Sequence, residues 1–264
     1  MTSITGSEPT IAHPSTTTVA RPSRGRRAAL TVVAVLNCAL PTIFTINLTR
    51  MLLTGELSDH RFHQATGQGL ILCALWLLPI LAMLRAGWQG RRPSTPVGYL
   101  HLVLIVAGSV CTAVAPGGGA PFLVGIIAVT GALLWLALPL RPQLRVPVQI
   151  DPLLAPIALT GSALLLPYAV DQLSLQNAAT GHHAQNPHFF DMAWISVTLS
   201  CVALLAALKP ALRVLAGWFA AGMVALGVAG IAFGESGTWS LAVLALGLVA
   251  AVAPRLVRRQ SARN

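Results

Sequence analysis

The chain has 264 residues, of which 55% are hydrophobic and only 9% are charged. A soluble domain carries about 25% charged residues, so this composition excludes an ordinary soluble fold. The net charge of +10 comes from basic residues at the ends of apolar runs, which indicates that their partners are the headgroups of a lipid bilayer and not nucleic acid.

The N-terminal segment is rich in Ser, Thr and Pro and ends in a cluster of arginines. It shows no apolar periodicity, so the sequence predicts a disordered cytoplasmic tail over residues 1–27. The apolar run that follows, 28–53, is too long for the core of a cleavable signal peptide and predicts a first spanning helix.

Further apolar runs of roughly 20 residues follow, each long enough to cross a bilayer as a helix. The sequence therefore predicts an all-α polytopic membrane protein with eight transmembrane helices. After the first, the predicted spans are 68–87, 97–115, 121–140, 153–173, 189–208, 212–233 and 238–256.

The basic residues divide unequally between the two sides that eight spans create. If the N-terminus is cytoplasmic, 15 of the 17 Lys and Arg residues fall on the cytoplasmic side, and only Arg50 and Arg61 fall outside. Cytoplasmic loops are enriched in Lys and Arg, so we expect both termini in the cytoplasm. All the basic residues except Lys209 are arginines, a bias typical of high-GC bacterial genomes, so we expect a bacterial cell membrane.

Two stretches share one plan, which predicts an internal duplication. A Leu-Pro pair precedes a Thr-Gly pair in each, and 14 positions separate Pro41 from Gly55 and Pro167 from Gly181. Because each half holds an even number of spans, the two copies should have the same orientation in the membrane. We expect parallel four-helix repeats at 28–140 and 153–256, a cytoplasmic linker at 141–152 and a basic cytoplasmic tail at 257–264.

The candidate site residues lie at the start of the second helix of each predicted repeat. His188 and Asp191 are i and i+3 there in the second copy, and Asp59 and His63 are i and i+4 in the first. Such spacings place side chains on one face of a helix. Imidazoles and carboxylates bind transition metals and histidine can ligate haem iron, so these four residues are candidate ligands. The alternative, which we favour, is that they cap helices or form hydrogen bonds at the outer loops.

Two other ionisable residues stand out. Asp171 lies near the outer end of the fifth predicted span, where a carboxylate is a candidate functional group; we expect it in the headgroup layer, because that span is nearly complete there. His101 lies near the inner end of the third span, and we expect it at the membrane interface. The cysteines have no metal-site spacing and are expected to be packing residues: Cys38, Cys73, Cys111 and Cys201.

The segment LPYAVDQ, followed by a histidine and then by DMAW, resembles a motif in uncharacterised multi-span membrane proteins of actinobacteria. That resemblance carries no known activity. The plan of two parallel four-helix repeats also resembles haem A synthase, whose halves each hold haem-ligating histidines on their second and fourth helices. His63 and His188 match the second-helix positions, but 121–140 and 238–256 contain no histidine, so this resemblance implies an architecture and not an activity.

Four hypotheses of function follow from these features. A non-enzymatic membrane protein (a scaffold, an immunity or stress factor, or a subunit of a complex) fits best, because the predicted spans lack ionisable residues at mid-depth and no P-loop, GxSxG or HExxH motif occurs. The others are an outer-face redox protein that binds a metal or haem, a small-molecule or lipid transporter, and a membrane enzyme acting on isoprenoids. The enzyme would need acids such as Asp171, Asp191 or Glu235 to converge. A membrane protein or a second copy of the chain is the expected protein partner.

Overall fold

The computed structural model of the protein describes residues 22–55, 61–185 and 187–261. The fold is 82% helical, with no β-strand in these described ranges, which confirms the predicted all-α class. The first helix already begins at Arg24, so the last residues of the predicted disordered tail are helical. Ser23 accounts for this start, because its Oγ accepts a hydrogen bond from the Arg26 N–H at 3.3 Å and caps the helix.

Short helical segments precede the second and the sixth of the long helices. The elements up to residue 137 are α1 (Arg24–Thr54), α2 (Arg61–Ala65), the π-helical turn η1 (Thr66–Leu70), α3 (Ile71–Trp88), α4 (Thr95–Val114) and α5 (Ala120–Ala137). The later elements are α6 (Leu154–Ala178), α7 (His182–Gln185), α8 (His188–Leu208), the 3₁₀ turn η2 (Pro210–Leu212), α9 (Leu215–Phe233) and α10 (Gly237–Ser261).

Seven helices in the described part of the chain are long and apolar enough to cross a bilayer: α1, α3, α4, α5, α6, α8 and α9. A shorter apolar stretch, Gly237–Val252, forms the first part of α10. The chain is therefore a multi-pass membrane protein embedded in a lipid bilayer.

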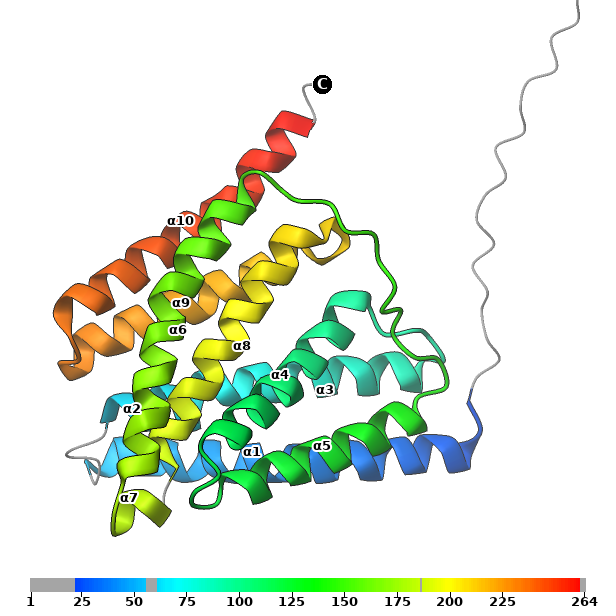
Figure 1. The fold of residues 1–264 in the computed structure, drawn as a ribbon. Helices are drawn as coiled ribbons and strands as arrows, with labels where there is room; N and C mark the ends of the chain where they lie inside the picture. Colours follow the sequence, from blue (N-terminus) through cyan, green and yellow to red (C-terminus); the bar gives the residue numbers. More distant parts are fainter. Residues whose placement is uncertain (1–21, 56–60, 186, 262–264) are drawn as a thin grey trace, which may run out of the picture.

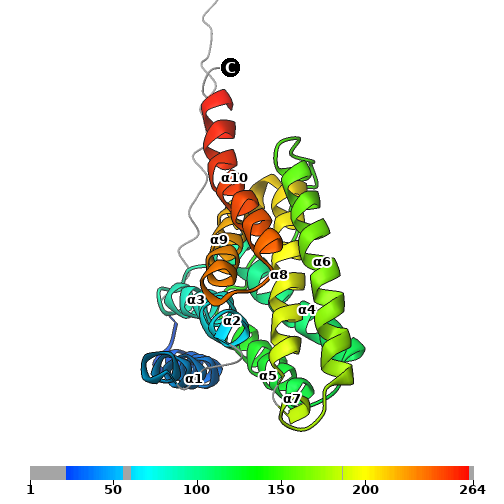
Figure 2. The same ribbon diagram turned by 90° about the vertical axis from the view of Figure 1, so that its left-hand side faces the viewer.

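The helices pack as two rings of four (Figures 1 and 2). In the first ring, α1 and α4 each contact both α3 and α5. In the second ring, α6 and α9 each contact both α8 and α10. The two rings meet where α8 contacts α4, α3 and the α2–η1 segment, while α2 and η1 also contact α9. In each ring, the four helices therefore contact one another in chain order, and the last helix contacts the first.

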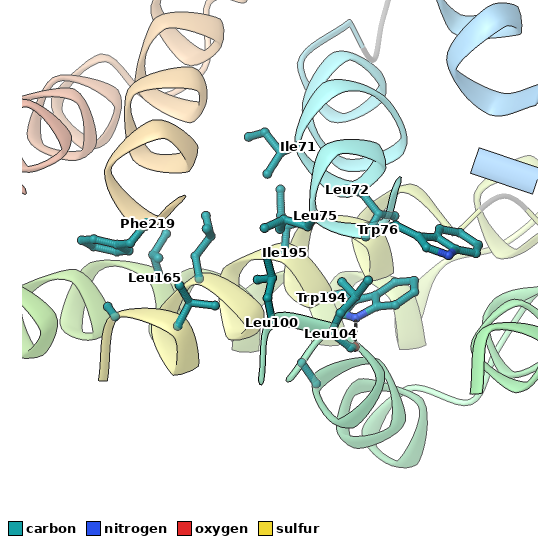
Figure 3. Packing of buried hydrophobic residues seen from close by; sticks show 14 of the residues in the cluster. Ile71, Leu72, Leu75, Trp76, Leu100, Leu104, Leu165, Trp194, Ile195 and Phe219 are labelled. Carbon is teal, nitrogen blue, oxygen red and sulfur yellow. Dashed lines mark hydrogen bonds between the residues drawn. The ribbon is translucent and has the colours of Figure 1, made fainter. Parts of the chain in front are cut away.

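Helix α8 lies at the centre of the fold, and 72% of its most apolar stretch is buried inside the protein. Its Trp194 is fully buried, and the indole Nε1–H donates to the Leu104 carbonyl of α4 at 2.7 Å (Figure 3). Ile195 and Trp194 lie among side chains of α3 and α4 in the same view. This tryptophan therefore fixes α8 against the first ring by both shape and a hydrogen bond.

The two ends of the molecule differ in composition. We name the end that carries α2, α7 and the start of α8 the histidine end, and the end that carries residues 138–153 the linker end; they lie at the lower left and upper right of Figure 1. At the linker end, Asp151 accepts hydrogen bonds from the Leu153 and Leu154 N–H groups, which caps α6. Its other oxygen pairs with Arg213 Nε at 2.9 Å, so the linker is fixed to the start of α6 and to the short segment between α8 and α9.

The predicted fifth span, 153–173, ends too early, because α6 continues to Ala178. In the additional turns the buried amide of Gln176 is hydrogen-bonded to the segment 183–190. Gln172 and Gln176 are 5% and 3% exposed and face the protein, whereas hydropathy alone takes a polar run as the end of a span. Pro41 and Pro167 both lie inside helices, α1 and α6.

The contact of α8 with α4 gives a test of the packing. A Cβ on Gly108 would lie 2.7 Å from the Trp194 ring, whereas a Cβ on Gly125, also helical, would meet nothing within 4 Å. We expect Gly108→Ala to destabilise the protein by about 1–3 kcal/mol through overpacking. Gly125→Ala should be neutral or stabilising by up to about 1 kcal/mol. Thermal unfolding in detergent measures both, and equal effects would contradict this account of α8.

Candidate functional site at the histidine end

The turn η1 and the start of α8 are in direct contact at the histidine end. Gly69 has a non-helical conformation, with φ −105° and ψ −112°, inside the π-helical turn. A Cβ on Gly67 would lie 3.2 Å from the Asp191 Cβ and 3.1 Å from the Met192 sulfur. The hydroxyl of Thr66 also lies 3.1 Å from that sulfur. Glycine at position 67 therefore allows α8 to approach η1 closely. A π-helical turn inside a helix is frequent at functional sites, so this contact marks a candidate site.

His188 and Asp191 both lie in the first turn of α8, three positions apart. They are 1% and 2% exposed, so an imidazole and a carboxylate are buried between the two rings. The free N–H groups at the start of a helix favour a negative charge such as that of Asp191. Pro187 stands at the cap position of this helix, and Asn186 before it lies outside the described residues.

A cavity of about 220 Å³ lies beside Asp191. Its polar lining includes the Asp191 carboxylate and the amides of Gln64 and Asn47, and its aromatic lining consists of Phe44 and Trp76. Trp76 is 1% exposed, and its Nε1 has no hydrogen-bond partner among the described residues. The remaining lining residues are Met51, Leu72, Cys73, Leu123 and Pro187. The cavity thus combines one acidic group with hydrogen-bonding and aromatic groups.

Ring contacts bring three imidazoles to the histidine end. His63 lies edge-on to Phe189 with ring centroids 5.5 Å apart, and Phe189 lies 5.9 Å from the ring of His183. His183 in turn lies 6.4 Å from the ring of His188. Histidines of α2, α7 and α8 therefore share one network of ring contacts.

Gln176 joins α6, α7 and α8 and was not identified from the sequence. Its Nε2–H donates to the His183 carbonyl at 3.2 Å, and its Oε1 accepts from the Phe190 N–H at 3.3 Å. The sequence signal that could have identified it is the pair Gln172 and Gln176, which are i and i+4 at the end of an otherwise apolar helix.

The other predicted site residues have different positions. Asp171 is exposed on the side of α6, whereas Asp191 is buried beside the cavity. Asp59 lies outside the described residues. In the part of the chain that the structure describes, no three His, Cys, Asp or Glu side chains form a group that could hold a metal ion.

A second group of aromatic residues lies between α2, α6 and α10. Tyr168 stacks on Trp239 with ring centroids 4.5 Å apart, and Phe62 lies edge-on to Trp239 at 6.3 Å. Glu235, in the loop before α10, is close enough to Tyr168 to interact with it electrostatically. Partial burial raises the pKa of the Glu235 carboxyl above its usual range.

His101, which we expected at the depth of the membrane interface, is fully buried inside the protein. The Trp135 Nε1–H donates to His101 Nδ1 at 3.1 Å, and the two rings are stacked. Gly131 makes room for the imidazole, because a Cβ there would lie 2.9 Å from the His101 ring. Contact with α5 therefore places this histidine in the interior of the first ring. The four cysteines are free thiols.

Comparison of the chain with protein-family models, with curated proteins and with solved structures gives no match. The function proposed below is therefore inferred from the geometry of the chain.

Glu235 predicts how stability depends on pH. Its folded-state pKa is raised, so the folded protein binds this proton more tightly than the unfolded chain, and stability should fall as pH rises through the raised pKa. Glu235→Gln should remove this part of the dependence, which begins near the ordinary Glu pKa of about 4.3, and should stabilise the protein at higher pH. The melting temperature as a function of pH measures it, with Asp171→Asn as control. An unchanged profile in Glu235→Gln would contradict the burial of this carboxyl.

Proposed function

We propose that the protein has eight spans arranged as two parallel four-helix repeats. The support for the eighth span is that α10 continues as a helix for 25 residues, to Ser261. The support for the repeat is the equal order of contacts in the two rings. Gly55 and Gly181, at equivalent positions after Pro41 and Pro167, also share a left-handed backbone conformation, with φ of 72° and 59°.

We further propose that the linker end faces the cytoplasm of a bacterial cell, together with both termini. The support is the concentration of basic residues in the segments at this end. Single cysteines tested in a chain that lacks the four native thiols would report on this orientation. A cysteine at His183 should react with a membrane-impermeant maleimide on intact cells, and one at Arg145 should react only after permeabilisation. The reverse pattern would contradict the orientation. Labelling of both cysteines on intact cells would contradict the number of spans between them.

For activity, we propose that the protein is a non-enzymatic membrane protein that binds a small organic cation in the cavity beside Asp191. The observation that carries this proposal is the position of a buried carboxylate on the wall of a cavity, in the first turn of a spanning helix. Carboxylates are costly to place there and are most often retained for binding or transport. A scaffold, a stress or immunity factor, or a complex subunit could use such a site to sense its ligand.

The cavity lining favours an organic cation over an inorganic one. The rings of Phe44 and Trp76 offer faces to an ammonium group, while the carboxylate of Asp191 supplies the opposite charge. The unpartnered Trp76 N–H and the amide of Gln64 supply hydrogen bonds to a hydroxyl on the same ligand. The exposure of Asp171, compared with the burial of Asp191, disfavours the convergence of acids that an isoprenoid-processing enzyme would need.

The test compares two carboxylates. Choline and tetramethylammonium should raise the melting temperature of the wild-type protein, because a ligand at 100 times its Kd stabilises the folded state by about 2.7 kcal/mol. Asp191→Asn should lose this effect. Asp171→Asn, which removes the same charge from the exposed face of the neighbouring helix, should retain it. The proposal would be contradicted if these cations stabilised Asp191→Asn as much as the wild type, or if they stabilised neither protein.

The second candidate function is a redox protein that binds a metal or haem, favoured by the network of imidazoles from α2, α7 and α8. Its proposed ligands are His63 and His188, with Asp59 and Asp191 as partners that orient the imidazoles. An absorption spectrum and metal analysis of the purified protein test it. Bound haem or metal that is lost in both His63→Ala and His188→Ala would support this function, and its retention in both variants would reject it.

A further inference from the structure

A groove of about 420 Å³ lies between α1 and α3 at the linker end, at the opposite end of the molecule from the proposed cation site. Its lining is Thr31, Leu81, Leu84, Arg85, Trp88 and Gln89. Helix α1 begins and α3 ends at this corner, so the groove lies at the depth where the apolar helices meet the polar headgroups.

The polar rim of the groove is a group of donors. The Trp88 indole N–H donates to the Thr31 hydroxyl at 2.9 Å, and this hydroxyl donates to the Arg27 carbonyl at 2.9 Å. The Arg27 guanidinium lies 5.7 Å from the centre of the Trp88 ring, and its Nε has no hydrogen-bond partner among the described residues. Arg85 is exposed on the groove itself. Two guanidinium groups therefore flank the groove.

The corner carries no compensating acidic group in the sequence around it. No Asp or Glu occurs between Glu8 and Glu56 or between Asp59 and Asp151. Further arginines lie at the start of α1 and shortly after the end of α3: Arg24, Arg26, Arg91 and Arg92. Arg26 is already occupied, since it donates to the carbonyls that end α5. This net positive charge attracts an anionic occupant.

The walls below the rim are apolar. Leu81 is 49% exposed and Trp88 is 46% exposed, and Leu84 completes the wall. An inorganic anion would leave this wall without a partner, whereas an acyl chain would cover it.

We propose that this groove binds one anionic phospholipid, with the phosphate on Arg27 and Arg85 and an acyl chain along Leu81, Leu84 and Trp88. Basic pockets between spanning helices at a cytoplasmic surface recognise anionic headgroups in this way. The inference is independent of the cation site, because it concerns different helices at the other end of the molecule.

The experiment is native mass spectrometry of the full chain in detergent, with equal amounts of phosphatidylglycerol and phosphatidylcholine of the same chain length. The wild type should retain one phosphatidylglycerol in preference to phosphatidylcholine. In the double variant Arg27→Gln/Arg85→Gln, retention should fall by roughly fivefold for each arginine removed. The matched control, Arg141→Gln/Arg145→Gln, removes the same charge from exposed positions of the linker and should retain the lipid.

Leu81→Trp separates the two halves of the proposal, because it fills the groove and leaves both arginines in place. It should abolish retention. Added inorganic phosphate should not displace the lipid. Equal retention of the two lipids, equal loss in the matched control, retention by Leu81→Trp, or displacement by phosphate would each overturn the assignment.

Discussion

The burial of α8 between the two rings of helices is the constraint on which the rest of the structure depends. This helix contacts α6 and α9 within its own ring and α4, α3 and η1 of the other ring. The Trp194 hydrogen bond to Leu104 and the missing side chain at Gly108 fix its position in the first ring. The same packing buries Asp191 and His188 in the first turn of α8, so the candidate site is a consequence of how the rings meet.

The chemistry of the molecule is divided between its two ends. The histidine end holds a carboxylate and amides around a cavity, together with a separate network of imidazoles, and the linker end holds arginines around an apolar groove. Between them, the spanning helices are joined by apolar packing and a few hydrogen bonds. This separation favours a protein that binds one kind of molecule at each face over an enzyme with acids gathered in its core.

Hydropathy predicted the positions of the long helices well, because each apolar run has the length of one span. It could not predict which face of each helix is buried, since these helices are apolar around their whole circumference. Asp171 and Asp191 show the consequence: both lie toward the same end of the molecule, yet α6 exposes one and α8 buries the other. The interior position of His101 likewise depends on contact with Trp135 of α5, which no local pattern encodes.

The central claim is that η1 and the start of α8 are in direct contact, and a disulfide tests it most directly. The Cβ positions of residues 67 and 191 lie 3.2 Å apart, slightly closer than the roughly 3.5–4.5 Å of a disulfide, so a shift of a few tenths of an ångström allows the bond. In a chain without native cysteines and with a protease site in the linker, Gly67→Cys/Asp191→Cys should cross-link the two halves under mild oxidation, and Gly67→Cys/Asp171→Cys should not. Failure of the first pair to cross-link, or equal cross-linking of both pairs, would contradict the account.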